Sequence, residues 1–320
     1  MAGQARHDET EKTMNNNTSI FQKPTMQLLL IAMLCVFSAT LFSIVAGLLV
    51  VVFFGFDLQS FNDYTNPDVI AGLKFFQLMS AIGVFIVPPV VYGLIVTKKP
   101  FVLLALNKVS TPKNWLLMGI IMVISVPFMS WLVEFNSNLV LPDFLTSLEH
   151  WMKQSEQSAE QLTKAFLSFN GLGSFLYVLL IVAVVPAIGE ELLFRGVLQK
   201  IMVDWIKNYH VAIWVTAILF SALHMQFYGF LPRMLLATIF GYVFYWSGSL
   251  WLPVLGHFIN NGSVVTLSFF YPEMINNTEI SLFEGNANWV ATIISGILLL
   301  GVMLIFKRLN KPNPQISSFN

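Results

Sequence analysis

Long apolar segments alternate with short polar segments along the whole 320-residue chain. A helix needs about 20 apolar residues to cross the hydrocarbon core of a bilayer. Segments of about this length or longer lie at residues 26–54, 69–96, 115–135, 174–205, 211–225, 230–246, 251–270 and 289–306. The pattern therefore predicts an all-α polytopic membrane protein with about eight transmembrane helices around an intramembrane site.

Composition supports this class. Hydrophobic residues make up 56% of the chain and charged residues 11%, which leaves too little polar surface to cover a soluble protein of this size. The formal net charge is +0 and no basic block is present, so a nucleic-acid partner is not expected. The single cysteine, Cys35, excludes an intramolecular disulfide and a cysteine-based metal site.

The charges of the connecting segments predict the orientation of the chain. Basic residues lie after the second apolar segment, in and after the last part of the fourth, and after the eighth: Lys98, Lys99, Lys108, Lys113, Lys200, Lys207, Lys307, Arg308 and Lys311. The alternate connections are acidic. By the positive-inside rule both termini are expected in the cytoplasm, in a bacterial-type plasma membrane. Arg233 does not fit this pattern, and we interpret it as a side chain that snorkels to the outer interface.

The chain divides into six predicted regions. These are a polar cytoplasmic tail (1–25), three N-terminal membrane helices (26–135), an outer loop (136–173), a core of four helices (174–270), a second outer loop with the last helix (271–306), and a cytoplasmic tail (307–320). Within the first outer loop, residues 141–169 place Phe144, Leu148, Trp151 and Met152 at helical spacing. This spacing predicts an amphipathic helix on the membrane surface, with a lid or a docking site as the alternative. Residues 100–106 are also expected at an interface.

The most unusual stretch is Gly-Glu-Glu-Leu-Leu-Phe-Arg-Gly at residues 189–196, inside an apolar helix. Glu191 and Arg195 are four residues apart on one helix face and can form an ion pair. Glu190 points roughly 100° away from that face. Ionisable groups at membrane depth are costly and usually mark a functional site, so Glu190 is the first candidate for chemistry.

Two histidines lie within the apolar segments that follow. Phe220 stands one helical turn before His224, and His257 stands one turn before Asn261. Glu190 and His224 lie at similar distances from the predicted turn near Asn208, so they are expected to face each other across an antiparallel hairpin. Counting residues from the turns also predicts that this site lies in the inner half of the membrane and opens to the cytosolic side.

A carboxylate with imidazoles beside it suits hydrolysis. We expect Glu190 to act as a general base on water and His224 to hold that water or take its proton. His257 and Asn261 would supply two donors to an oxyanion. Glu191 and Arg195 are expected to support the site, and Phe220 to form its wall. Glu190, His224 and His257 could instead ligate a catalytic Zn²⁺, and the motifs leave the zinc and metal-free versions equally open.

Three motifs in this order resemble the CPBP family of intramembrane proteases, which includes type II CAAX prenyl endopeptidases and Abi-like, bacteriocin-processing proteins. They are Glu-Glu-x-x-x-Arg at 190–195, Phe-x-x-x-His at 220–224 and His-x-x-x-Asn at 257–261. The resemblance covers residues 174–270. It implies an eight-helix endopeptidase that cleaves a membrane-associated peptide or protein by means of water activated by the first glutamate. The alternatives are a proton-coupled membrane transporter and a non-catalytic scaffold or immunity factor.

Overall fold

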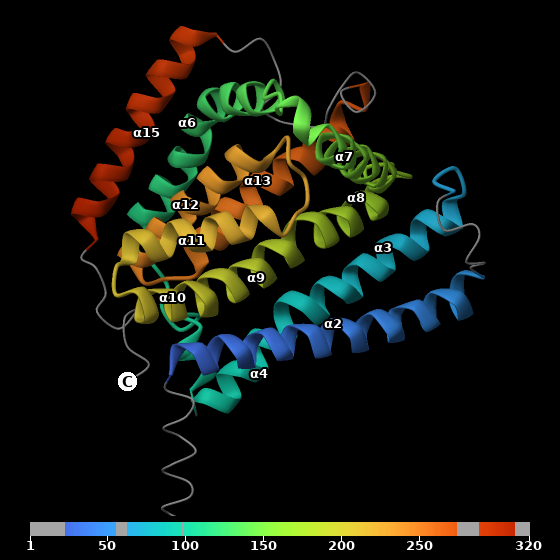
Figure 1. Cartoon of the computed structure of the whole chain (residues 1–320), viewed down its shortest axis with the longest axis horizontal. Helices are drawn as coiled ribbons and strands as arrows, with labels where there is room; N and C mark the ends of the chain where they lie inside the picture. Colours follow the sequence, from blue (N-terminus) through green and yellow to red (C-terminus); the bar gives the residue numbers. More distant parts are fainter. Residues whose placement is uncertain (1–22, 56–62, 98, 274–287, 311–320) are drawn as a thin grey trace, which may run out of the picture.

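The computed structural model describes residues 23–55, 63–97, 99–273 and 288–310, and these residues form helices and their connections. Residues 1–22, 56–62, 98, 274–287 and 311–320 lie outside the described residues, and with them most of the two predicted tails, part of the second outer loop, Lys98 and Lys311. Figure 1 shows that the described residues fold into helices packed around one another. In chain order the helices are α2 (Pro24–Phe54), α3 (Pro67–Ala81), α4 (Val87–Val96), α5 (Pro100–Leu103), α6 (Pro112–Ser137), α7 (Thr146–Phe166), α8 (Leu172–Leu179), α9 (Val185–Glu191), α10 (Gln199–Ile206), α11 (Tyr209–Ala222), α12 (Phe230–Ser247), α13 (Trp251–Phe270) and α15 (Trp289–Leu309).

Five helical stretches among the described residues are long and apolar enough to cross a membrane. They are Pro24–Phe54, Pro67–Val96, Pro112–Ser137, Leu172–Ile206 and Trp289–Leu309. The chain is therefore a polytopic integral membrane protein, and five of the predicted membrane helices are confirmed. The other three correspond to α11, α12 and α13, which form at the predicted positions. Of these, α11 is only 14 residues long, and α12 and α13 have polar side chains within their apolar sequences.

Three π-helical turns interrupt two of the membrane helices, where the sequence pattern predicts regular α-helix. They are η2 (Ile82–Ile86), η4 (Leu180–Val184) and η5 (Leu192–Leu198). The first two turns come just before Pro88 and Pro186, because a proline inside a helix lacks an N–H and crowds the preceding turn. Residues 67–96 and 172–206 nevertheless continue as two unbroken helical stretches.

Pro186 has a direct consequence for the packing of α13. In a regular helix the backbone N–H of residue 186 would donate to the carbonyl of Val182, and proline cannot do so. Asn261 on α13 donates its Nδ2 hydrogen to this Val182 oxygen instead, at 3.0 Å. Side chains from neighbouring helices commonly satisfy carbonyls freed in this way inside a membrane. The bond therefore fixes α13 beside the helix that carries Glu190.

A side chain of α15 also hydrogen-bonds to backbone groups next to a proline, in this case Pro127 of α6. The backbone N–H of Phe128 donates to Ser295 Oγ at 3.1 Å, and Ser295 Oγ donates to the carbonyl of Ile124 at 2.5 Å. The hydroxyl thus inserts into the α6 hydrogen-bond ladder next to the proline. Because polar groups in lipid need a partner, this contact fixes the position of the last membrane helix.

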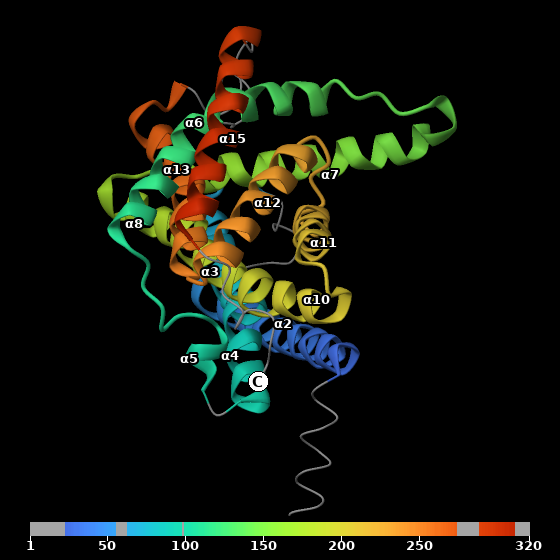
Figure 2. The same cartoon turned by 90° about the vertical axis from the view of Figure 1, so that its left-hand side faces the viewer.

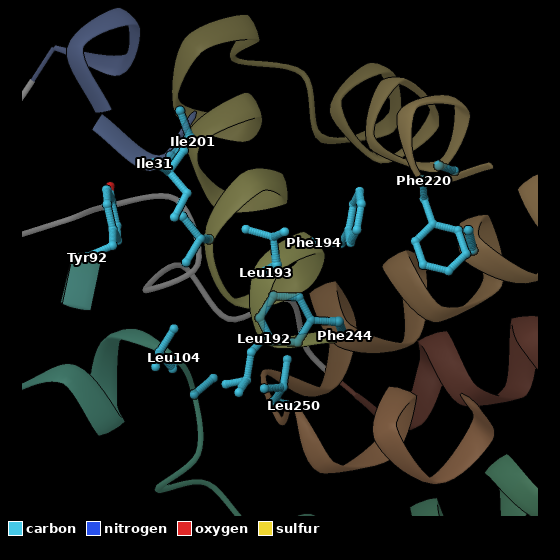
Figure 3. Close-up of a cluster of buried hydrophobic side chains, with 14 residues drawn as sticks. Ile31, Tyr92, Leu104, Leu192, Leu193, Phe194, Ile201, Phe220, Phe244 and Leu250 are labelled. Atoms are coloured by element: carbon cyan, nitrogen blue, oxygen red, sulfur yellow. The ribbon is translucent and has the colours of Figure 1, made fainter. Parts of the chain in front are cut away.

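The largest apolar cluster surrounds the helix that carries the glutamates. Its fully buried members include Ile31, Tyr92, Leu104, Leu192, Leu193, Phe194, Ile201, Phe220, Phe244 and Leu250. Figure 3 shows these side chains converging on the η5 turn from α2, α4, α11, α12 and the segment after α5. The Glu190 helix is therefore enclosed by protein around this turn, which allows it to hold charged groups away from lipid.

Residues 100–106 were expected at a membrane interface, and the structure corrects this expectation in part. Phe101 and Val102 are exposed, but Leu104 and Ala105 are buried in the apolar cluster. Lys200 Nζ donates to the carbonyl of Leu103. The second half of this segment, residues 103–106, therefore packs against the helical stretch that carries Glu190.

Gly189 allows the Glu190 helix to pack closely on the η2 turn. A Cβ atom at this position would lie 2.8 Å from Phe85 Cβ and 3.1 Å from Ile86 Cγ1. We expect Gly189→Ala to lower the free energy of unfolding by about 1 to 3 kcal/mol, because overpacking of a close helix contact forces the backbones apart. Thermal unfolding of the purified protein in detergent measures this change.

Gly173→Ala is the matched control, since a Cβ atom at Gly173 meets nothing within 4 Å. We expect this variant to unfold at the wild-type temperature or slightly above it. Equal stability of the two variants would contradict the close packing of α9 on η2.

Candidate active site

A buried network of three charged or titratable side chains connects the Glu190 helix to α13. Arg195 Nη1 donates to Glu191 Oε1 at 3.0 Å, so the ion pair predicted from the sequence is present. His257 Nδ1 donates to the same carboxylate oxygen at 2.9 Å. Arg195 Nη2 donates to the carbonyl of Ala237 on α12 at 2.9 Å. All three side chains are buried, and together they hold three helices in register.

Glu190 faces a different space from Glu191. It lines a cavity of about 430 Å³ together with His224 and His257. Glu190 Oε2 lies 3.9 Å from His224 Nε2 and 3.8 Å from His257 Nε2. These distances exceed a direct hydrogen bond, and they suit a small molecule that contacts all three groups. Glu190 Oε2 has no hydrogen-bond partner among the described residues.

The partners of the two rings determine which nitrogens face the cavity. His224 Nδ1 lies 2.7 Å from the carbonyl of Phe220, which can only accept, so Nδ1 carries the hydrogen. In the neutral ring this leaves a lone pair on Nε2, the atom nearest Glu190. His257 donates through Nδ1 to Glu191, and its Nε2 also points toward Glu190. Each imidazole is thus oriented by a second contact.

Phe220 forms the wall between the buried network and the cavity. Its ring packs edge-on against Phe194 at 4.9 Å and lies 4.8 Å from the ring of His224. Arg195 Cζ lies 5.0 Å from the centroid of the Phe220 ring. The Phe194 and Phe220 side chains are visible side by side in Figure 3. The packing places Phe220 where the sequence motif predicts a wall residue.

Asn260 and Asn261 both line the cavity, although the helix register predicts that Asn260 turns away from the His257 face. Asn260 Nδ2 donates to Asn261 Oδ1 at 3.0 Å, and Asn261 in turn donates to Val182. Asn261 is thus held from two sides, one turn after His257. The amide nitrogen of Asn261 carries a second hydrogen, which the bond to Val182 does not use.

The sequence did not identify Glu156, Glu160, Gln226 and Arg233 as residues of this cavity. The expected position of Arg233 at an outer interface stays a prediction, and the structure adds that its side chain also contacts the cavity wall. Its Nη2 donates to Gln226 Oε1 at 2.9 Å and its Nη1 to the Gln226 carbonyl at 3.2 Å, within the cavity wall. Arg233 reaches the cavity because it lies in the first turn of α12, beside the loop that carries Gln226.

The cavity reaches a side of the molecule that the sequence did not predict, and the opening to the cytosolic side stays a prediction. The cavity extends to Glu156, Glu160 and Thr163 on α7 and to the 226–229 loop. Figures 1 and 2 show α7 at the end of the molecule away from α10 and the turn that follows it, toward which the site was predicted to open. Residue counting did not predict this extension because it treated His224 as part of a helix, whereas α11 ends at Ala222. His224 therefore lies beyond the helix, near α7.

The donor atoms of the site are of the kinds that bind a catalytic zinc, namely a carboxylate oxygen and two imidazole nitrogens. Among the described residues, no group of three or more His, Cys, Asp or Glu side chains is arranged to hold a metal ion. The zinc and metal-free versions therefore both stay predictions, and the chemistry below uses only groups of the chain.

Fold and cavity define a polytopic membrane protein with a buried carboxylate and two imidazoles facing one another between its helices. Residues 172–263 match the family described as Type II CAAX prenyl endopeptidase Rce1-like. The chain therefore carries an Rce1-like domain of the CPBP family. All seven residues of the three sequence motifs fall within the matched segment.

A curated relative is the "Uncharacterized protein YpbD" of Bacillus subtilis (strain 168). It is 28% identical to this chain over 102 residues, which make up 31% of this chain and 47% of that protein. The match therefore spans about half the length of the relative. No solved structure matches the chain.

Proposed function

We propose that this protein is an intramembrane endopeptidase whose water nucleophile is activated by Glu190. The observation that carries the proposal is the convergence of Glu190 Oε2 with the Nε2 atoms of His224 and His257, at 3.9 and 3.8 Å. A carboxylate oxygen that is buried and accepts no hydrogen bond can serve as a general base toward a water held between it and the two rings. The Rce1-like family match supports a protease.

In the proposed mechanism, Glu190 takes a proton from water as the water oxygen attacks the scissile carbonyl. The Nε2 lone pair of His224 holds the second hydrogen of the water, and the Phe220 carbonyl orients the ring. The oxyanion that forms is stabilised by the Asn261 amide and by His257 in its imidazolium form, in which Nε2 carries a hydrogen while Nδ1 donates to Glu191. Glu190 then delivers its proton to the leaving amine, so the carboxylate is regenerated at the end of the cycle.

The substrate we propose is a membrane-associated peptide or protein, reached from the bilayer. We propose that α11, α12 and α13 also cross the membrane, which gives eight crossings together with the five long apolar stretches. Both termini would then lie in the cytoplasm, in a bacterial-type plasma membrane. The family name refers to prenylated substrates. The substrate proposed for this chain is a membrane-associated peptide or protein without a specified prenyl group.

A comparison of membrane-peptide termini tests the proposal. Cells that contain the native chain are compared with cells that contain Glu190→Ala, and the new termini are identified by mass spectrometry. We expect termini that appear only with the native chain. Identical termini in both strains would reject proteolysis and favour a transporter or a scaffold.

Elemental analysis of the purified, active protein distinguishes a water activated by bound zinc from a water activated by Glu190 alone. Stoichiometric zinc whose removal ends activity would identify a metalloendopeptidase. Full activity after chelation would identify a metal-free glutamate protease.

We predict that Asn261→Ala lowers turnover by about a hundredfold or more with little change in substrate binding, as the loss of one oxyanion donor typically does. Asn260→Ala is the matched comparison, because Asn260 also lines the cavity but donates only to Asn261 among its described partners. We expect a smaller loss of turnover for it. Steady-state kcat and KM of the two variants measure the difference, and a larger loss for Asn260→Ala would transfer the oxyanion role to Asn260.

A further inference from the structure

His224 is the least firmly held member of the site. It lies after the last residue of α11, in the segment of residues 223–229 that connects α11 to α12, called here the His224 loop. The side chain of His224 is 31% exposed, whereas that of Glu190 is 11% exposed and that of His257 is 8% exposed. The position of its Nε2 atom therefore depends on the backbone of this loop.

The His224 loop has a conformation that its own sequence does not favour. Met225, directly after His224, has φ 56, in the left-handed region where residues other than glycine are uncommon. Such a backbone persists only when surrounding contacts impose it. The contacts that hold the loop are thus part of what positions His224.

Asn136, near the end of α6, makes the largest share of these contacts. Its Nδ2 donates to the carbonyls of Phe227 and Tyr228 at 2.8 and 2.7 Å. Its Oδ1 accepts from the backbone N–H of Leu231 at 3.1 Å. Asn136 is 4% exposed, so these backbone groups are held by one buried amide at the junction of the loop with α12.

Two further contacts hold the same loop from other sides. Ser221 Oγ donates to the carbonyl of Phe230 at 2.7 Å. On α7, Glu156 Oε2 accepts from the Tyr228 N–H at 3.3 Å, and the ring of Trp151 lies 5.2 Å from that of Phe227. Figures 1 and 2 show the α11–α12 connection rising toward α6 and α7. Asn136 differs from these partners because it binds three backbone groups at once.

We propose that Asn136 is a positioning residue for His224. By fixing residues 227–231 it maintains the left-handed turn at Met225 and thereby keeps His224 Nε2 opposite Glu190. Asn136 lies outside the segment that matches the Rce1-like family. The N-terminal half of the chain thus takes part in assembling the site. The kinetic part of this proposal rests on the proposed peptidase function.

Asn136→Leu and Asn136→Ser test the proposal. The leucine removes all three hydrogen bonds, and the serine keeps one hydroxyl that can serve a single carbonyl. Asn138→Leu is the matched control, because Asn138 lies two residues further along and is exposed. Histidine-selective NMR of the protein in detergent reports the surroundings of each imidazole, and the His224 signals are assigned by their absence in His224→Gln.

We expect both Asn136 variants to shift the His224 signals and leave those of His257 nearly unchanged. In a peptidase assay well below the unfolding temperature, kcat should fall about tenfold or more while KM changes less than about threefold, because general acid–base contributions of this size depend on geometry. Asn138→Leu should match the wild type in both measurements.

His224 signals at their wild-type positions in a folded Asn136 variant would overturn the proposal. Failure of Asn136→Ser to accumulate would assign Asn136 to folding and overturn it as well. The NMR measurement needs no substrate, so it can succeed or fail independently of the proposed function. Absence of peptidase activity in the wild type, together with shifted His224 signals, would reject the peptidase and retain the positioning role.

Discussion

Glu190→Gln is expected to reduce peptide hydrolysis by about 10² to 10⁴-fold, the range contributed by a positioned general base. The amide has nearly the shape of the carboxylate but cannot accept the proton of the attacking water. Glu190 Oε2 has no hydrogen-bond partner among the described residues, so the substitution breaks no contact of that atom. We therefore expect the variant to fold and unfold like the wild type. Turnover of the purified protein and its thermal unfolding measure the two effects.

Glu160→Gln is the matched control. Glu160 also lines the cavity, but it lies on α7 and forms an ion pair with Lys164 on its own helix. We expect its turnover to stay within about twofold of the wild type, since exposed helical pairs contribute little. Glu190→Gln with more than a tenth of wild-type turnover would contradict the general-base role.

The sequence was sufficient to predict the helices and their local pairs. The ends of α12 and α13 lie at or within one residue of the ends of the apolar segments at 230–246 and 251–270. This agreement arises because a helix in lipid must satisfy its own backbone, so apolar length and helix length coincide. The Glu191–Arg195 pair was predictable for a similar reason, since the spacing of four residues defines a contact within one helix.

Contacts between distant segments could not be predicted in this way. The hydrogen bond from Asn261 to Val182 depends on Pro186, but the sequence does not reveal which side chain reaches the freed carbonyl. The contact of Arg233 with Gln226 depends on the path of the 226–229 loop, which the sequence does not define. The opening of the cavity depends on how α7 lies over the bundle. Helical periodicity contains no information on these placements.

Arg195→Met is expected to lower the free energy of unfolding by about 3 to 5 kcal/mol, the usual cost of removing one partner of a buried ion pair. Arg195 is 1% exposed and Glu191 is 0% exposed, so neither water nor lipid headgroups can replace the lost partner. The substitution also leaves the Ala237 carbonyl without the Arg195 donor. Thermal unfolding in detergent and the amount of protein in the membrane measure the loss.

The double variant Glu191→Gln with Arg195→Met separates the cost of a stranded charge from the value of the pair itself. With both charges removed, the amide oxygen introduced at position 191 can still accept from His257 Nδ1, and replacing a buried pair with neutral groups is often close to neutral in stability. We therefore expect the double variant to unfold at a higher temperature than Arg195→Met. Arg308→Met, at an exposed position in the last turn of α15, is the control for loss of an arginine and should behave like the wild type. A double variant less stable than Arg195→Met would show that the pair stabilises the fold beyond the neutralisation of Glu191.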